Sequence, residues 1–150
     1  MKGTKSRKYF KKISECDVYE VANRTELHSA VILSGKLENQ VLLKREDKQP
    51  IFSFKLRGAY NKLLNLKNKD RGHKVIAASA GNHAQGVAYA SRRIGIKSII
   101  VMPVTTPSIK VNSVKSYGAK VVLYGDNFDE SYEYAKKLAL KKDYVFIHPY

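Results

Sequence analysis

The chain has 150 residues, of which 43% are hydrophobic and 27% charged, as in an ordinary globular protein. No apolar run approaches the roughly 20 residues of a membrane span, and we expect neither a membrane segment nor a secretory signal. Cys16 is the single cysteine. It cannot form an internal disulfide, which favours a cytoplasmic protein.

The charge is concentrated at the N-terminus. The formal net charge is +15. The first twelve residues carry six cations and no acid: Lys2, Lys5, Arg7, Lys8, Lys11 and Lys12. Such an arm can bind nucleic acid or an anionic surface. No zinc knuckle or aromatic RNA-binding signature accompanies it, so we expect residues 1–17 to be a basic, disordered lead without a nucleic-acid partner.

The next part of the chain predicts a few short elements. After a short piece at 18–22, the pattern predicts a helix over 25–37 and a strand over 41–44. Pro50 interrupts the pattern, and a further helix is predicted from Ser53 to about Leu66. Residues 67–72 are polar and turn-like.

From residue 74 onward, apolar runs alternate with helical patterns. The predicted strands are short and rich in β-branched residues, and they lie at 75–78, 99–102, 121–124 and 145–147. Helices are predicted between them: over 82–94, from Pro107 to a point before Gly118, and from a cap at Asp126 or Asn127 to Leu140. This alternation predicts an α/β fold with a parallel sheet and right-handed crossover helices.

A polar loop follows the first of these strands. In parallel sheets, ligands bind beyond the carboxyl ends of the strands, where Ser79-Ala80-Gly81-Asn82 lies. Backbone N–H groups at the start of the next helix favour an anion, and Gly81 allows close approach of a ligand. The alternative is an ordinary turn capped by Ser79 or Asn82. The run ending at Gly86 is neither a dinucleotide fingerprint nor a P-loop.

Lys55 occupies an unusual position for a cation. It follows Ser53, a good N-cap, and therefore lies in the first turn of a helix, where the dipole disfavours positive charge. Phe54 and Leu56 flank it and favour partial burial. Together these effects favour a neutral amine, which reacts with carbonyl compounds. The alternative is a lysine that points into solvent. Ser53 lacks a triad and is interpreted as a cap rather than a nucleophile.

Two motifs carry a resemblance to a known family. Residues 53–59, with sequence Ser-Phe-Lys-Leu-Arg-Gly-Ala, and residues 79–86, with sequence Ser-Ala-Gly-Asn-His-Ala-Gln-Gly, resemble the threonine dehydratase family of pyridoxal-phosphate (PLP) enzymes. The resemblance spans residues 18–150, and residues 44–50 are most similar to the biosynthetic members. It implies that residues 67–150 form the small domain of the tryptophan-synthase-β-like PLP fold. Residues 18–66 would then be the N-terminal part of a larger domain.

The resemblance also implies residue roles. Lys55 would form the imine with PLP and then take the α-proton, while Phe54 packs beside the cofactor ring and Asn82 hydrogen-bonds its 3′ oxygen. The substrate-carboxylate loop would consist of Ser79, Ala80, Gly81, Asn82 and His83. The implied reaction converts L-threonine to 2-oxobutanoate and ammonia, a step of isoleucine biosynthesis.

Several expectations limit this interpretation. No glycine-rich run is present to hold the PLP phosphate, so we expect the chain to be an N-terminal fragment of a homo-oligomeric enzyme, with doubtful activity by itself. His28, His73, His83 and His148 show no metal-ligand spacing, and no metal is expected. The alternatives are a related PLP enzyme that acts on serine, such as serine racemase or serine dehydratase, and a non-catalytic basic binding module.

Overall fold

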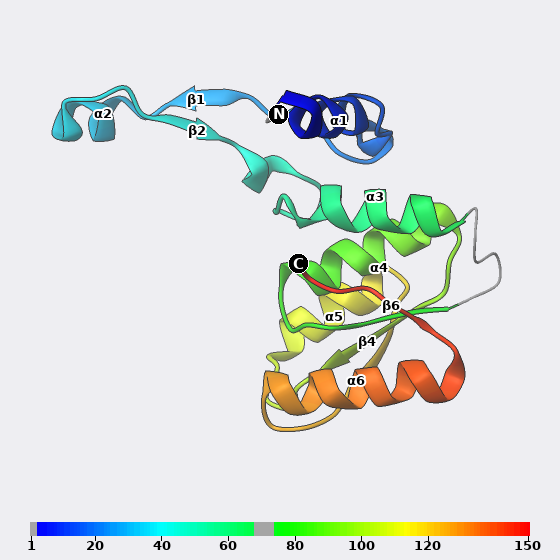
Figure 1. Cartoon of the computed structure of the whole chain (residues 1–150). Helices are drawn as coiled ribbons and strands as arrows, with labels where there is room; N and C mark the ends of the chain where they lie inside the picture. The colour runs from blue at the N-terminus through cyan, green and yellow to red at the C-terminus, as the bar shows by residue number, and fades with distance from the viewer. Residues whose placement is uncertain (1–2, 68–73) are drawn as a thin grey trace.

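The computed structural model describes residues 3–67 and 74–150, which form a layered sheet domain and a projecting arm (Figure 1). The sheet has four parallel strands in the order β5-β4-β3-β6. Their bounds are β3 Val75–Ala78, β4 Ser98–Met102, β5 Lys120–Leu123 and β6 Val145–Phe146. The predicted parallel α/β fold is thus confirmed, and β3 has the predicted bounds.

Helices cover both faces of this sheet because the strand side chains alternate between two cores. On one face, Val75, Ala77 and Ile100 pack with α4 (Asn82–Ile94) and α5 (Ser108–Ser116). On the other face, Ile76 and Val101 pack against α6 (Phe128–Lys142). The central strands β3 and β4 are buried on both sides. Strand β5 is partly exposed because it lies at the sheet edge, whereas the sequence predicted a buried strand.

Helix α3 (Lys55–Lys67) lies directly on α4 and shares its core, with Leu56, Tyr60 and Leu63 buried. Gly86 of α4 makes this approach possible. A Cβ atom at Gly86 would lie 3.2 Å from the carbonyl oxygen of Lys55 and 3.4 Å from the Cβ of Ala59. The glycine therefore brings the first turn of α3 against α4, close to the carboxyl end of the sheet.

The projecting arm, residues 18–50, differs from the sequence prediction. Residues predicted as one helix over 25–37 form strand β1 (Leu27–Ser29) and the short helix α2 (Val31–Leu37). Strand β1 pairs antiparallel with β2 (Leu42–Lys44). Cross-strand pairing has outweighed a weak helical pattern that lacks a proline at its start. Short 3₁₀ turns, η1 (Val18–Glu20) and η2 (Glu46–Lys48), lie near the two ends of the arm.

The N-terminal segment is a helix rather than the expected disordered lead. Helix α1 (Gly3–Ser14) carries Tyr9, Phe10 and Ile13 at helical spacing, and all three are exposed. The ion pair between Lys11 and Glu15, at 3.7 Å and about one helical turn apart, supports the helix locally. The predicted turn at 67–72 falls almost entirely outside the described residues. Among the helices of the described ranges, none is both long and apolar enough to cross a membrane.

The contact at Gly86 gives a first testable prediction. Gly86→Val should force α3 away from α4 and lower the free energy of unfolding by about 1–3 kcal/mol, because a branched side chain has no room there. The same change at Gly58, where a Cβ would meet no atom within 4 Å, should alter stability by less than about 0.5 kcal/mol. Urea unfolding followed by circular dichroism measures both. Equal stability of the two variants would contradict the close packing.

Candidate active site

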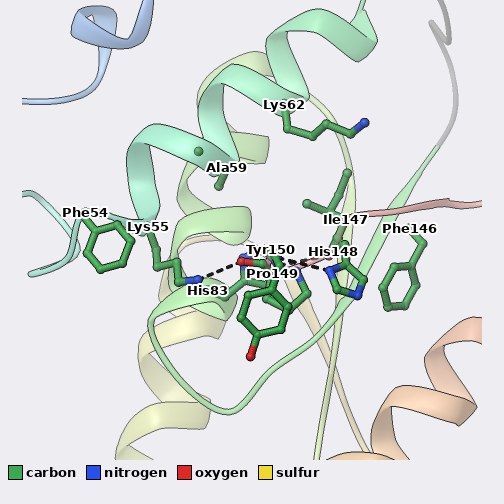
Figure 2. Close-up of a pocket in the computed structure, with 11 residues that line it drawn as sticks. Phe54, Lys55, Ala59, Lys62, His83, Phe146, Ile147, His148, Pro149 and Tyr150 are labelled. Carbon is green, nitrogen blue, oxygen red and sulfur yellow. Dashed lines mark hydrogen bonds between the residues drawn. The ribbon is translucent and has the colours of Figure 1, made fainter. Parts of the chain in front are cut away.

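Two adjoining cavities lie where the N-terminal ends of α3 and α4 meet the carboxyl end of the sheet. Their volumes are about 380 and about 330 Å³. Both are lined by Phe54, Lys55, His83, Pro149 and Tyr150. Figure 2 shows these side chains around one opening, with Lys55 entering from α3. Both cavities lie at the edge of the sheet where open parallel α/β folds bind ligands. Because they adjoin and share these residues, they are treated together as one ligand cavity.

Lys55 is the first residue of α3, as predicted. Its backbone N–H donates to the Ser53 hydroxyl at 3.3 Å, which satisfies one of the free N–H groups at the helix start. Its amine is half-buried and donates to the carbonyl oxygen of Pro149 at 2.8 Å (Figure 2). The same Nζ lies 5.6 Å from the Phe54 ring centre and 5.4 Å from that of Tyr150. The amine thus faces the cavity.

The predicted polar loop lines the smaller cavity together with this amine. The side chains of Ser79, Asn82 and His83 line the cavity that Lys55 also lines. The Ser79 hydroxyl accepts a hydrogen bond from the Gly81 N–H at 3.1 Å, and Gly81 is the N-cap of α4. The structure therefore brings five of the seven predicted residues together: Phe54, Lys55, Ser79, Asn82 and His83. Ala80 and Gly81 belong to the same loop but are not among the residues that line the cavities.

His83 has a buried, well-defined environment. Its side chain is only 7% exposed, and Nε2 lies 3.0 Å from the carbonyl oxygen of Ile147. Burial lowers the pKa of the His83 imidazole below its ordinary value, and the charge of Lys55 acts in the same direction. A neutral ring with a proton on Nε2 donates to Ile147. The sequence did not predict this contact with the last strand.

The sequence analysis also missed one side of the cavity. Phe146, His148, Pro149 and Tyr150 line it, and the Tyr150 N–H donates to Nδ1 of His148 at 3.2 Å. Strand β6 pairs in parallel with β3, so residues that follow the two strands lie at the same sheet edge. The pairing of β6 with β3 becomes visible only once the strand order is known.

A polar network fixes the start of α3 on the side away from the cavity. Arg57 donates to the Glu46 carboxylate through Nε at 2.8 Å and Nη2 at 2.9 Å. The Thr25 hydroxyl donates to the same carboxylate at 2.6 Å. The hydrogen bonds from Arg57 lower the pKa of Glu46 to about 2, so this carboxylate is ionised at neutral pH.

The fold and site define a class of protein: a parallel α/β domain that presents a lysine amine and a helix N-terminus to one small-molecule cavity. A family model described as pyridoxal-phosphate dependent enzyme matches residues 18–150. The chain belongs to this family of pyridoxal-phosphate dependent enzymes.

Individual relatives agree with this assignment. The chain is 48% identical over 148 residues to the biosynthetic L-threonine dehydratase of Burkholderia multivorans, covering 97% of this chain and 29% of that protein. The processed form of threonine deaminase isoform 2 from Solanum lycopersicum has a TM-score of 0.93 and 46% identity, over 99% of this chain and 41% of that structure. Maize serine racemase has a TM-score of 0.82 and 30% identity, over 88% of this chain and 40% of that structure. The chain thus spans less than a third of the length of the curated relative named above.

The lowered pKa of His83 predicts a pH dependence of stability. The unfolded chain binds a proton near the ordinary histidine pKa of about 6.5, whereas the folded chain resists it. This contribution to stability is present above that pH and is lost as the pH falls below it. His83→Gln should therefore lose less stability than the wild type between about pH 7.5 and about pH 5.5.

Urea unfolding at the two pH values measures this difference. The matched control is His28→Gln on the exposed strand β1, which should follow the wild type. An identical loss in the His83 variant and the wild type would show that the buried imidazole is not held neutral.

Proposed function

We propose that this chain carries the lysine and the substrate loop of a PLP-dependent lyase that converts L-threonine to 2-oxobutanoate and ammonia. The observation that carries the proposal is the position of the Lys55 amine in one cavity with Ser79, Asn82 and His83. The 48% identity to the biosynthetic L-threonine dehydratase of Burkholderia multivorans favours threonine over other amino acids.

The residues that line the cavity fit the aldehyde and the ring of the cofactor. PLP is an aldehyde, and Lys55 supplies a primary amine that lies inside a small-molecule cavity. The Phe54 ring lies next to that amine and can pack beside a planar ring. Asn82 at the start of α4 supplies an amide to a ring oxygen. When bound, PLP supplies the electron sink for removal of a proton from the substrate's α-carbon.

The chain's own residues have separate tasks in this proposal. Lys55 would hold the cofactor, and its amine, once freed from the cofactor, would accept the α-proton at Nζ. The loop 79–83 binds the substrate carboxylate with backbone N–H groups at the positive end of the α4 dipole. The space beside Gly81 is open, since a Cβ there would meet no atom within 4 Å. An approaching carboxylate can therefore use that space.

A small amino acid is the proposed ligand, and the homo-oligomeric state and cytoplasmic location stay predictions from the sequence. The division of the chain into residues 18–66 and 67–150 also stays a prediction. The packing of α3 on α4 shows that the lysine helix shares a core with the sheet domain.

The proposal predicts lysine-specific capture of PLP. The purified chain mixed with PLP should develop the visible absorbance of lysine-bound cofactor, and Lys55→Ala should abolish it because no other amine faces the loop in the described structure. Lys62→Ala is the matched control, since Lys62 lies on the same helix and lines the larger of the two cavities but not the loop side. Lys62→Ala should keep the absorbance. Persistence of this absorbance in Lys55→Ala would contradict the proposal.

A further inference from the structure

The proposed function leaves the ion pair between Glu46 and Arg57 without a role. Neither side chain lines the cavity, yet both are largely buried, with side-chain exposures of 17% and 23%. The ion pairs Lys11–Glu15, Lys48–Glu26 and Lys136–Glu133 are more exposed, with side-chain exposures between 47% and 74%. A buried, fully hydrogen-bonded pair usually fixes a geometry rather than adding much stability.

This pair joins three segments that are distant in sequence. Gln49, which is 1% exposed, donates to the Asn23 carbonyl at 3.0 Å and accepts from the Asn23 N–H at 2.8 Å. Arg57 donates to the same Asn23 carbonyl at 3.1 Å. Thr25 completes the set with its bond to Glu46. Residues 23–25, 46–49 and the first turn of α3 are therefore held as one unit.

The link to Lys55 is short. Arg57 is two residues beyond Lys55 in the same helical turn, and its backbone N–H donates to the Phe54 carbonyl at 3.0 Å. The first turn of α3 contains no acidic residue of its own. Glu46 supplies the missing negative charge from outside the helix, near the positive end of its dipole.

The opposite side of the turn is fixed by packing. Gly86 lies against the Lys55 carbonyl, so α4 blocks movement in that direction. The turn is therefore held between a steric contact on one side and a charged network on the other. The lysine side chain has many rotamers, and its amine faces the loop only if the backbone of this turn is fixed.

We propose that Glu46 and Arg57 are positioning residues, which hold the first turn of α3 so that the Lys55 amine faces the Ser79–His83 loop. This inference deepens the proposed function and rests on it for its meaning in catalysis. The placement of Lys55 can nevertheless be tested without any cofactor.

The test measures how reactive the Lys55 amine is relative to a reference amine. The full chain is labelled with a trace of acetic anhydride, and mass spectrometry gives the ratio of acetylated Lys55 to acetylated Lys62. Glu46→Gln and Arg57→Lys should both change this ratio several-fold, because the turn that carries Lys55 loses its anchor while Lys62 lies two turns further along. Arg57→Lys keeps the charge but cannot donate two parallel hydrogen bonds.

Asp47→Asn is the matched control. Asp47 is the neighbour of Glu46 and also binds an arginine through two nitrogens, at 2.9 and 2.7 Å to Arg45. That pair is more exposed, with side-chain exposures of 30% for Arg45 and 58% for Asp47. The control should keep the wild-type ratio. Circular dichroism checks that each variant is folded. If Glu46→Gln does not fold, Arg57→Lys alone carries the test.

A second measurement separates this inference from the proposed function. In titrations with PLP, Glu46→Gln should take up the cofactor about tenfold more weakly than the wild type, as expected for a misplaced reacting group. An unchanged Lys55-to-Lys62 ratio in folded Glu46→Gln and Arg57→Lys would overturn the positioning role. A changed ratio in a chain that never takes up PLP would uphold the positioning role and count against the proposed function.

Discussion

The site depends on the close contact between the first turn of α3 and helix α4. Gly86 has no side chain. A Cβ atom at this position would lie only 3.2 Å from the carbonyl oxygen of Lys55. This contact brings two helix N-termini to the same end of the sheet, one carrying the lysine and the other carrying the polar loop. A larger residue at Gly86 would separate the amine from the loop before any chemistry could occur.

The electrostatics of the cavity follow from this arrangement. The positive ends of α3 and α4, together with the Lys55 amine, make the region favourable for anions. His83 adds little to this charge at neutral pH, because burial lowers the pKa of its imidazole below the ordinary value. The negative charge of Glu46 lies outside the cavity, where it balances Arg57 without competing for a ligand. An anionic ligand such as a carboxylate or a phosphate is therefore favoured.

Much of the fold could be predicted from the sequence because the strands at 75–78 and 99–102 are short, apolar and fully buried. The helix over 82–94 was equally clear, since Gly95 ends it with a positive φ of 80°. Residues 25–37 were predicted less well, because a three-residue strand depends on a partner that no local pattern reveals. The helix over residues 3–14 was missed because a high density of lysines was interpreted as disorder.

The site was predictable to the extent that its residues lie in contiguous motifs. Lys55 and the loop 79–83 stood out, but their proximity depends on Gly86, whose role is visible only once α3 lies on α4. The contribution of residues 146–150 required the strand order, and the partnership of Glu46 with Arg57 required the folded arm. The sequence thus indicated the chemistry, while long-range packing determined its geometry.

The central claim is that Lys55, among the many lysines of this chain, is the one that shares a cavity with Ser79, Asn82 and His83 in the described structure. Reduction of the PLP-treated chain with borohydride, followed by peptide mapping, tests it most directly because the cofactor becomes permanently attached where it was bound. The account predicts a pyridoxyl group at Lys55 at substoichiometric PLP. Labels spread over surface lysines, with Lys55 unmodified, would contradict it.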